Sequence, residues 1–567
     1  MIDDRPDDAP EPSAALATFA ARIDAMPDGA VQRRYSLWQI YLSFVGLALG
    51  GAIGTLQAFD RAGHDFYESV GLNSYYQGLS IHGVALAIVF TFTFSNGWLQ
   101  YATMRGFNRP LSQTWLVKAS FWLSAVGIAL ATFALLADEA TVLYTMYAPL
   151  QASWMYYLGA ALLVVGTWAV LANQLVTLRA WRKDNPGERI PLISYASIAT
   201  YLMWGLASIG IAVEVLVFLL PWSLGLIDGV DPLLTRTLFW FTGHPIVYFW
   251  LLPAYVAWYL VVPKRAGGRL FSDPVVRVVF IMFLLLSTPV GLHHQFTDPG
   301  VDEGLKFVHG LLTFAVFFPS VITAFTLMAA LEEGGRKKGG KGLLGWIPRL
   351  PWKDPLAATN ILAMITFLFG GMSGLINASA TVNKVVHNTS FVPGHFHMTV
   401  GSAVALSFMG IAYWLVPHMT GKRLFSDRLA LVQAWLYAGG VLVFGRGLMV
   451  SGLNGQPRRV PINQATYGNA SWFEGDSLAA IGGFMMVIAG AMFFYNLIRT
   501  MASRQPARVH ELEFETSDSI VPASEGPAIL DSLGFWFIIA VVLVALAYTP
   551  AFIIQGFDPT SPTWQPW

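Results

Sequence analysis

The chain has 567 residues, of which 55% are hydrophobic and only 12% are charged. Soluble domains carry about 25% charged residues, so the composition excludes soluble, disordered, collagenous and nucleic-acid-binding proteins. The 34 basic and 34 acidic residues balance, which gives no reason to expect a polyanionic partner. There is no cysteine, which also excludes disulfides, iron–sulfur clusters and thiolate metal sites.

The apolar residues are grouped into about thirteen segments that are each long enough to cross a bilayer. Short connections join them, so the sequence predicts an all-α membrane protein with one transmembrane core, residues 36–555, between tails 1–35 and 556–567. Lys and Arg concentrate in the loops after even-numbered segments, which places the N-terminus in the cytoplasm and the C-terminus outside. The segments are 36–59, 75–102, 112–137, 153–181, 192–222, 232–262, 275–297, 305–333, 355–380, 391–417, 428–453, 476–502 and 530–555.

Six of the eleven histidines lie inside these apolar segments, where ionisable side chains are costly and usually functional. The predicted topology places all six in the outer part of the membrane. One histidine alone is explained equally well by a hydrogen bond between helices, but six at a shared depth indicate the ligands of one metal assembly. They are His82, His244, His293, His294, His395 and His397.

Helical geometry sorts the six histidines. His395 and His397 point about 200° apart around a helix, so they are predicted to hold two separate large cofactors, best matched by two flat macrocycles with axial imidazoles. His82 can supply a second axial ligand to one of them. The remaining three histidines suit copper. Tyr248 lies four residues after His244 on the same helical face, where its phenol can donate a proton and an electron.

Four motifs together resemble subunit I of the haem–copper oxygen reductases, and most closely the B class of ba-type cytochrome c oxidases from bacterial and archaeal plasma membranes. They are Thr242-Gly-His-Pro-Ile-Val-Tyr248, Gly291-Leu-His-His294, Val392-Pro-Gly-His-Phe-His397 and Tyr75-Tyr-Gln-Gly-Leu-Ser-Ile-His82-Gly. The resemblance implies that the whole helical core, from the first to the last predicted helix, adopts the fold of that subunit.

The resemblance also implies a role for each motif residue. His82 and His397 would be axial ligands of a low-spin haem b, and His395 the only protein ligand of a high-spin haem A-type. Copper CuB would be held by His244, His293 and His294. Tyr248 would be covalently joined to His244 and act as a redox-active proton donor.

Proton uptake is expected to avoid the A-class route. The resemblance implies a Glu at the position of Ile246 in that class, and an aliphatic side chain cannot carry protons. Hydroxyl groups on two helices instead suggest a water-filled path, which the B-class resemblance identifies as K-type, although hydrogen bonds between helices explain the same residues. These residues are Tyr248, Tyr255, Tyr259, Thr313, Ser320, Thr323 and Thr326, with Ser272 at the entrance.

Other polar residues are assigned by position. Arg458 and Arg459 lie in an outer loop where arginine is otherwise scarce, and they are expected to bind haem propionates. His387 resembles a residue on the proton exit side, while Asn383 replaces an Asp of the family pattern. Tyr144, Trp240 and Ile246 lie where the family has its oxygen channel, although core packing explains them equally well.

Two charged residues in predicted spans receive no role from the sequence. Glu214 matches a B-class Glu, and Arg446 matches no family position. A propionate, a formyl group or Glu214 itself is a conceivable partner for Arg446.

These assignments predict an enzyme that reduces oxygen to water, takes protons from the cytoplasm and pumps protons. Electrons would come through a subunit II that carries CuA, with a small single-helix subunit beside it, membrane lipid around it and cytochrome c as donor; quinol stays open. A nitric oxide reductase of the same superfamily is disfavoured by Tyr248 and Ile246. A secondary transporter is disfavoured because inverted repeats are missing.

Overall fold

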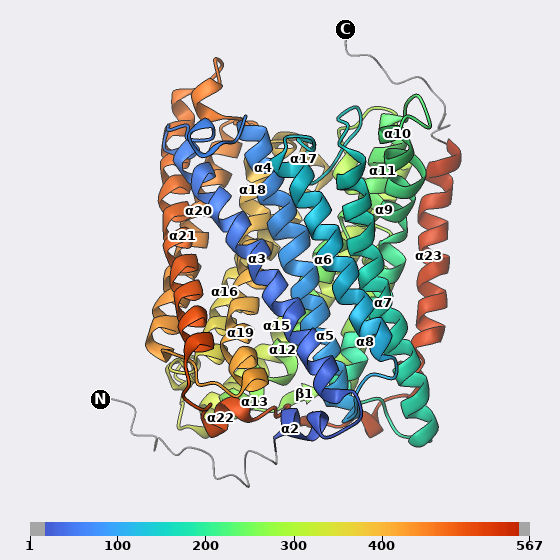
Figure 1. Cartoon of the computed structure of the whole chain (residues 1–567), viewed down its shortest axis with the longest axis vertical. Helices are drawn as coiled ribbons and strands as arrows, with labels where there is room; N and C mark the ends of the chain where they lie inside the picture. The colour runs from blue at the N-terminus through green and yellow to red at the C-terminus, as the bar shows by residue number, and fades with distance from the viewer. Residues whose placement is uncertain (1–17, 555–567) are drawn as a thin grey trace.

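The computed structural model describes residues 18–554, and it is a bundle of nearly parallel helices with one pair of short strands (Figure 1). The prediction of an all-α membrane protein is confirmed. Within the described residues, eleven helices are long and apolar enough to cross a membrane, or twelve when the bent pair Leu192–Ala207 and Ile209–Ser223 counts as one span. The predicted count of thirteen is therefore not confirmed.

The helices of the first half follow the predicted segments closely. In chain order they are α2 (Phe19–Asp24), α3 (Gly29–Arg61), η1 (Glu68–Val70), α4 (Tyr75–Val84), η2 (Ala85–Phe90), α5 (Thr91–Phe107), α6 (Thr114–Leu136), α7 (Trp154–Asp184), α8 (Leu192–Ala207), α9 (Ile209–Val213), η3 (Glu214–Leu219), α10 (Leu220–Ser223), α11 (Pro232–Gly243), α12 (Ile246–Leu260) and α13 (Val262–Ala266).

The second half contains the two strands and the remaining helices. In chain order they are β1 (Leu270–Ser272), α14 (Asp273–Leu286), η4 (Gly291–Gln295), α15 (Glu303–Lys337), η5 (Ile347–Arg349), α16 (Pro355–Ala378), α17 (Ala380–Val386), α18 (Phe391–Phe396), η6 (His397–Val404), α19 (Ala405–Thr420), α20 (Asp427–Leu453), η7 (Ile462–Gln464), η8 (Ala470–Trp472), α21 (Phe473–Ala502), α22 (Val509–Leu512), β2 (Ser519–Val521), η9 (Ala523–Glu525), η10 (Ala528–Asp531) and α23 (Leu533–Ile554).

Capping residues fix where several long helices begin. The side chains of Asp231, Ser272, Asp302 and Asp354 accept hydrogen bonds from backbone N–H groups in the first turns of α11, α14, α15 and α16. These N–H groups have no partner within the helix, so a side-chain oxygen at the N-cap stabilises the start. In three of the four helices a proline follows within the first two positions, where its fixed φ suits the first turn.

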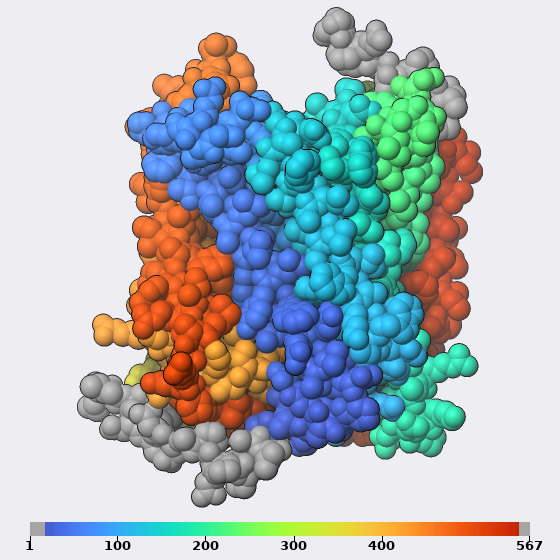
Figure 2. Space-filling view, in the orientation of Figure 1, coloured from blue at the N-terminus to red at the C-terminus, as the bar shows by residue number. Residues whose placement is uncertain are grey.

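Close packing of helix backbones holds the bundle together. At the crossing of α6 and α7, a Cβ added to Gly127 would lie 2.6 Å from the carbonyl oxygen of Gly159, and the converse contact would be 2.5 Å. Small residues permit such an approach, which favours association in lipid. In the space-filling view of the same face, side chains fill the gaps between the ribbons (Figure 2).

Five of the predicted spans are interrupted, and the interruptions lie beside the residues singled out from the sequence. Short π-helices lie at η2, η3 and η6. The first begins three residues after His82, and the other two begin at Glu214 and His397. His244 and Pro245 separate α11 from α12. The predicted span 275–297 is too short as a helix because α14 ends at Leu286, before Pro289. Such irregularities in membrane helices are tolerated inside protein and are frequent at functional sites.

The two ends of the bundle differ in what they hold. The segments α4, α11 and α18, which carry or adjoin the candidate histidines, lie at the upper end in Figure 1. Helix α2 and strand β1, which pairs in parallel with β2, lie at the lower end. Helix α23 runs along the outside and ends at the upper level.

Candidate metal centre

Three histidines converge at the breaks of two helices. One ring nitrogen each from His244, His293 and His294 lies within 4.8 Å of the others. The Nδ1 of His244 is 3.0 Å from the Nε2 of His294. Nitrogens that bind one tetrahedral ion at about 2 Å lie roughly 3.3 Å apart, so this donor set fits a single metal ion. Imidazole nitrogens are typical ligands of copper.

The neighbours of the three histidines hold their rings. His294 is stacked on Trp240, with ring centroids 3.8 Å apart and an interplanar angle of 4°. The Nδ1 of His293 lies 2.6 Å from the Val290 carbonyl oxygen and 2.9 Å from the Thr313 hydroxyl. These contacts leave Nε2 of His293 for the metal, as such partners of metal-bound histidines normally do. Thr313 thus contacts a candidate metal ligand.

Tyr248 lies against the same centre. Its hydroxyl is 2.9 Å from Nε2 of His244, while Nδ1 of that ring faces His294. One imidazole therefore separates the metal position from the phenol. This arrangement places a proton donor beside the centre without a charged side chain.

A second site lies between His82 and His397, which come from α4 and the start of η6. Their rings are nearly parallel, at 20°, with centroids 6.3 Å apart. Because a ring nitrogen sits about 2 Å from its metal and the ring centre about 1 Å farther, two axial imidazoles have centroids roughly 6 Å apart. Their Nδ1 atoms lie 2.9 Å from the Gly50 carbonyl oxygen and 2.7 Å from that of Pro393. Both Nε2 atoms are left for one ion.

His395 faces a different helix from His397, although the two are only two positions apart. Its Nδ1 lies 3.0 Å from the Ser373 hydroxyl and 3.1 Å from the Gly370 carbonyl oxygen, both on α16. A Cβ on Gly374 would lie 3.1 Å from its ring. The Nε2 of His395 is again free. The two histidines therefore belong to two separate sites.

Basic residues of the loop after α20 and of α11 lie near one another. Burial lowers the pKa of Arg458, and the neighbouring Arg459 lowers it further. Neither arginine has an ion pair with a carboxylate among the described residues, whereas Arg236 pairs with Asp298 at 2.7 Å. An anionic group between them would balance these charges, as haem propionates do. Sequence reasoning missed Arg236, because it lies in an apolar segment without a motif around it.

His387 lies beside this basic cluster. Burial, with Arg458 and Arg236 nearby, lowers its pKa to about 4. Its Nδ1 is 3.0 Å from the Asn383 Oδ1, and its Nε2 is buried without a partner among the described residues. Asn383 in turn donates to the Asn377 carbonyl oxygen at 2.7 Å. Because Nδ1–H donates to the Asn383 oxygen, Nε2 of the neutral ring is a hydrogen-bond acceptor, and it donates to a carboxylate such as a propionate only when the ring is protonated.

The candidate proton-path residues form two direct contacts between α12 and α15. Tyr255 donates to the Ser320 hydroxyl at 3.2 Å, and Tyr259 donates to that of Thr323 at 2.7 Å. The ring of Phe283 packs against both Tyr248 and Tyr255, at 5.2 Å and 5.8 Å between centroids.

The other two path residues bond only to residues three or four positions away in the chain. Thr326 donates to the Ile322 carbonyl oxygen at 2.8 Å, and Ser272 caps α14. The structure thus brings two tyrosine–hydroxyl pairs together and leaves Thr326 and Ser272 outside them.

Comparison with known proteins places the chain in a family. A family model described as "Cytochrome C and Quinol oxidase polypeptide I" matches residues 34–485. The chain belongs to this family of haem–copper oxidases. It is therefore a multi-span membrane oxidoreductase, and haem and copper are the cofactors of its family.

Individual relatives agree with the family model. Cytochrome c oxidase subunit 1 of Thermus thermophilus is 43% identical over 573 residues, which cover 97% of this chain and 100% of the relative. Quinol oxidase subunit 1 of Bacillus subtilis is 25% identical and covers 82% of this chain and 71% of the relative. A solved structure of a haem–copper terminal oxidase dimer has a TM-score of 0.89 and 35% identity, covering 94% and 95% of the two chains.

In this oxidase subunit, Glu214 lies at the start of η3, inside the fifth predicted span. Both of its carboxylate oxygens are buried without a hydrogen-bond partner among the described residues. Arg446 is exposed on α20, on the opposite side of the bundle from α9 and α10, which flank Glu214 (Figure 1). The suggested pair between Arg446 and Glu214 is therefore wrong.

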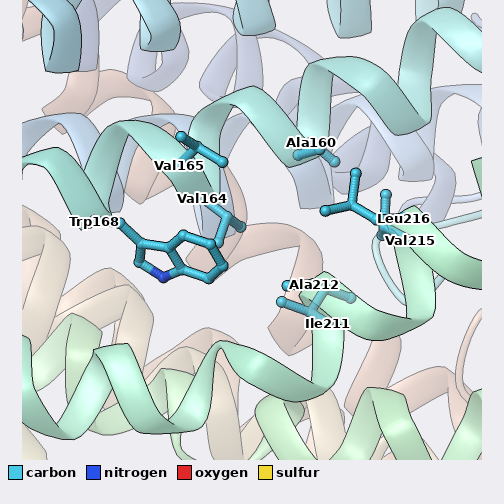
Figure 3. Close-up of a pocket in the computed structure, with 9 residues that line it drawn as sticks. Ala160, Val164, Val165, Trp168, Ile211, Ala212, Val215 and Leu216 are labelled. Atoms are coloured by element: carbon cyan, nitrogen blue, oxygen red, sulfur yellow. The ribbon is translucent and has the colours of Figure 1, made fainter.

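An apolar cavity of about 20 Å³ lies beside the π-helix η3, which begins at Glu214. Figure 3 shows that Val164 and Trp168 of α7 face Ala212 and Val215 across it. A cavity of this size holds roughly one molecule as small as water. None of the expected oxygen-channel residues lines it: Trp240 stacks on His294, Tyr144 lies in the loop after α6, and Ile246 begins α12.

Proposed function

We propose that this chain is subunit I of a B-class, ba-type cytochrome c oxidase that reduces oxygen to water. His82 and His397 would hold a low-spin haem b, and His395 a high-spin haem A-type. His244, His293 and His294 would hold CuB. When bound, the haems and the copper supply the electrons and the open coordination position for oxygen. The observation that carries this proposal is the three-histidine cluster with Tyr248 beside it.

The protein's own groups would manage protons and orientation. The Tyr248 hydroxyl donates a proton at the centre, and His244 holds the phenol in position through its Nε2. Trp240 fixes the plane of His294, which limits the rotation of that ligand. Arg458, Arg459 and His387 bind the propionates of the haems and so set their depth in the bundle.

Protons would enter from the cytoplasm through a K-type path and be pumped across the membrane. Tyr255 with Ser320 and Tyr259 with Thr323 form its middle. Ser272 lies at the entrance, Thr326 lines the lower part, and Thr313 lies at the top beside His293. Tyr248 and Tyr255 are about 10 Å apart along the helix, too far for a direct hydrogen bond. Water molecules must therefore carry protons between them past the ring of Phe283.

The surroundings of the subunit follow from this assignment. The transmembrane core would span residues 36–555, with tail 1–35 in the cytoplasm and tail 556–567 outside; residues 1–17 and 555–567 lie outside the described residues. Since the chain has no cysteine for a CuA centre, a subunit II would bring electrons from cytochrome c. A small single-helix subunit would complete the complex in the bacterial or archaeal plasma membrane.

Oxygen consumption by the purified complex tests the reaction. Reduced cytochrome c should support the uptake of one oxygen molecule for four electrons without accumulation of hydrogen peroxide. A quinol should be a poor donor. Rapid turnover of nitric oxide with negligible turnover of oxygen would instead favour a nitric oxide reductase, and activity with quinol alone would overturn the cytochrome c assignment.

Replacement of Tyr255 by Phe tests the proton path. The variant loses the hydroxyl that contacts Ser320 but keeps the ring, so turnover with cytochrome c is expected to fall about tenfold or more because proton delivery is interrupted. Both haem spectra should be unchanged. The matched control is Tyr437→Phe, a buried tyrosine on α20. Normal turnover of Tyr255→Phe would exclude this path.

A further inference from the structure

The helix that carries His293 and His294 is broken just before them. After α14 ends at Leu286, residues 287–290 are not helical, and all four are buried. The hydroxyl groups of Ser287 and Thr288 are buried without a partner among the described residues. Backbone N–H and C=O groups in such a segment must find partners outside the helix, because unpaired groups are costly in a membrane protein.

The last helix supplies those partners. Tyr548 of α23 donates from its hydroxyl to the Thr288 carbonyl oxygen at 3.2 Å, and the same hydroxyl accepts from the Gly291 N–H at 3.2 Å. One side chain therefore closes both sides of the break. Gly291 lies two residues before the first of the two histidines.

The absence of a side chain at Gly291 creates the position that the hydroxyl occupies. A Cβ there would lie 2.4 Å from the Tyr548 hydroxyl and 2.1 Å from the Trp240 carbonyl oxygen. The tyrosine ring is held by Phe241, at 4.5 Å, and by His309, at 5.0 Å between centroids. The Gly291 backbone, the Trp240 carbonyl group and the Tyr548 hydroxyl thus meet at one point.

His309 of α15 extends the same contacts. Its Nδ1 accepts from the Leu292 N–H at 3.5 Å, and its Nε2 lies 3.2 Å from the Ala547 carbonyl oxygen, next to Tyr548. The next turn of α15 carries Thr313, which contacts His293 directly. Two helices, α15 and α23, therefore hold the segment 287–295 through its backbone and through Nδ1 of His293.

We propose that Tyr548 is a positioning residue for the copper centre: it holds the broken segment 287–295 so that His293 and His294 keep their geometry. Helix α23 lies beyond residue 485, where the match to the family model ends. A helix outside the matched region would thus stabilise the centre. This inference rests on the proposed assignment of copper to the three histidines.

The test is Tyr548→Phe, which removes the hydroxyl and keeps the ring contacts with Phe241 and His309. In the purified complex, carbon monoxide is photolysed from the haem at low temperature, and the infrared band of carbon monoxide on copper is measured after incubation with a chelator. The variant is expected to lose this band about tenfold faster than the wild type, the lower end of the effect of removing a direct partner of a metal ligand, because Tyr548 acts on the ligands through the backbone. Hydrogen–deuterium exchange of residues 287–295 should also be faster.

The matched control is Tyr156→Phe. Its hydroxyl is equally buried, on α7, but has no hydrogen-bond partner among the described residues. Wild-type behaviour of Tyr548→Phe in both measurements would overturn the inference. So would faster exchange confined to α23 with an unchanged copper band, because Tyr548 would then only anchor its own helix. If the wild type itself gives no copper band, the assignment of copper fails instead.

Discussion

Replacement of Tyr248 by Phe is expected to lower oxygen consumption at least about a hundredfold, because a positioned proton donor typically contributes this much to a rate. The variant keeps the ring and loses only the hydroxyl that lies 2.9 Å from His244 Nε2. The measurement is steady-state oxygen uptake with reduced cytochrome c. Absorption spectra of both haems should remain unchanged, which shows that the fold and the cofactors are intact.

The control for this variant is the copper-bound carbon monoxide band. Since Tyr248 contacts His244 from the side away from His294, copper should remain in place and the band should persist. Oxygen uptake within a factor of about three of the wild type would contradict the role of Tyr248 as the essential donor. Loss of the band together with activity would show that the hydroxyl acts through the copper ligand instead.

Alanine substitutions of His82 and His395 are expected to affect different haems. His82 faces His397 across a gap suited to one iron, whereas His395 faces α16. In His82→Ala, the part of the reduced haem spectrum that carbon monoxide leaves unchanged should disappear. The low-spin haem is then either lost or able to bind carbon monoxide. In His395→Ala, the fraction that responds to carbon monoxide should disappear.

The two variants serve as controls for each other. Each should retain the spectrum of the site it does not touch, and added imidazole should partly restore the site it does. If His82→Ala removed the carbon monoxide-responsive fraction, or His395→Ala the silent one, the assignment of axial ligands would be contradicted. Loss of both haems in both variants would be resolved with His82→Met and His395→Met, which keep a potential ligand.

The sequence predicted the parts of the fold that depend on hydrophobicity and length. Long apolar runs such as 428–453 became single helices like α20. The predicted segment 275–297 is not one continuous helix, because its apolar residues continue from Leu286 to Val290 while the helix does not. The mean hydropathy of a segment does not show where a proline and a glycine interrupt its helix.

The candidate site was predictable where local spacing decides the geometry. His244 and Tyr248 are four residues apart in the sequence, and their side chains meet in the structure. Contacts between distant segments were not predictable in this way. Trp240 was considered for an oxygen channel but stacks on His294, and nothing around Arg236 or Tyr548 distinguishes them from ordinary residues of apolar helices. Only tertiary packing shows what they contact.

The optical spectrum of the dithionite-reduced complex, recorded before and after carbon monoxide, tests the central claim most directly. Two haems are expected: the one held by His395 should shift with carbon monoxide, while the one held between His82 and His397 should be silent. Photolysis should then transfer carbon monoxide to copper. A well-folded preparation without haem, or one in which both haems are silent, would contradict the account.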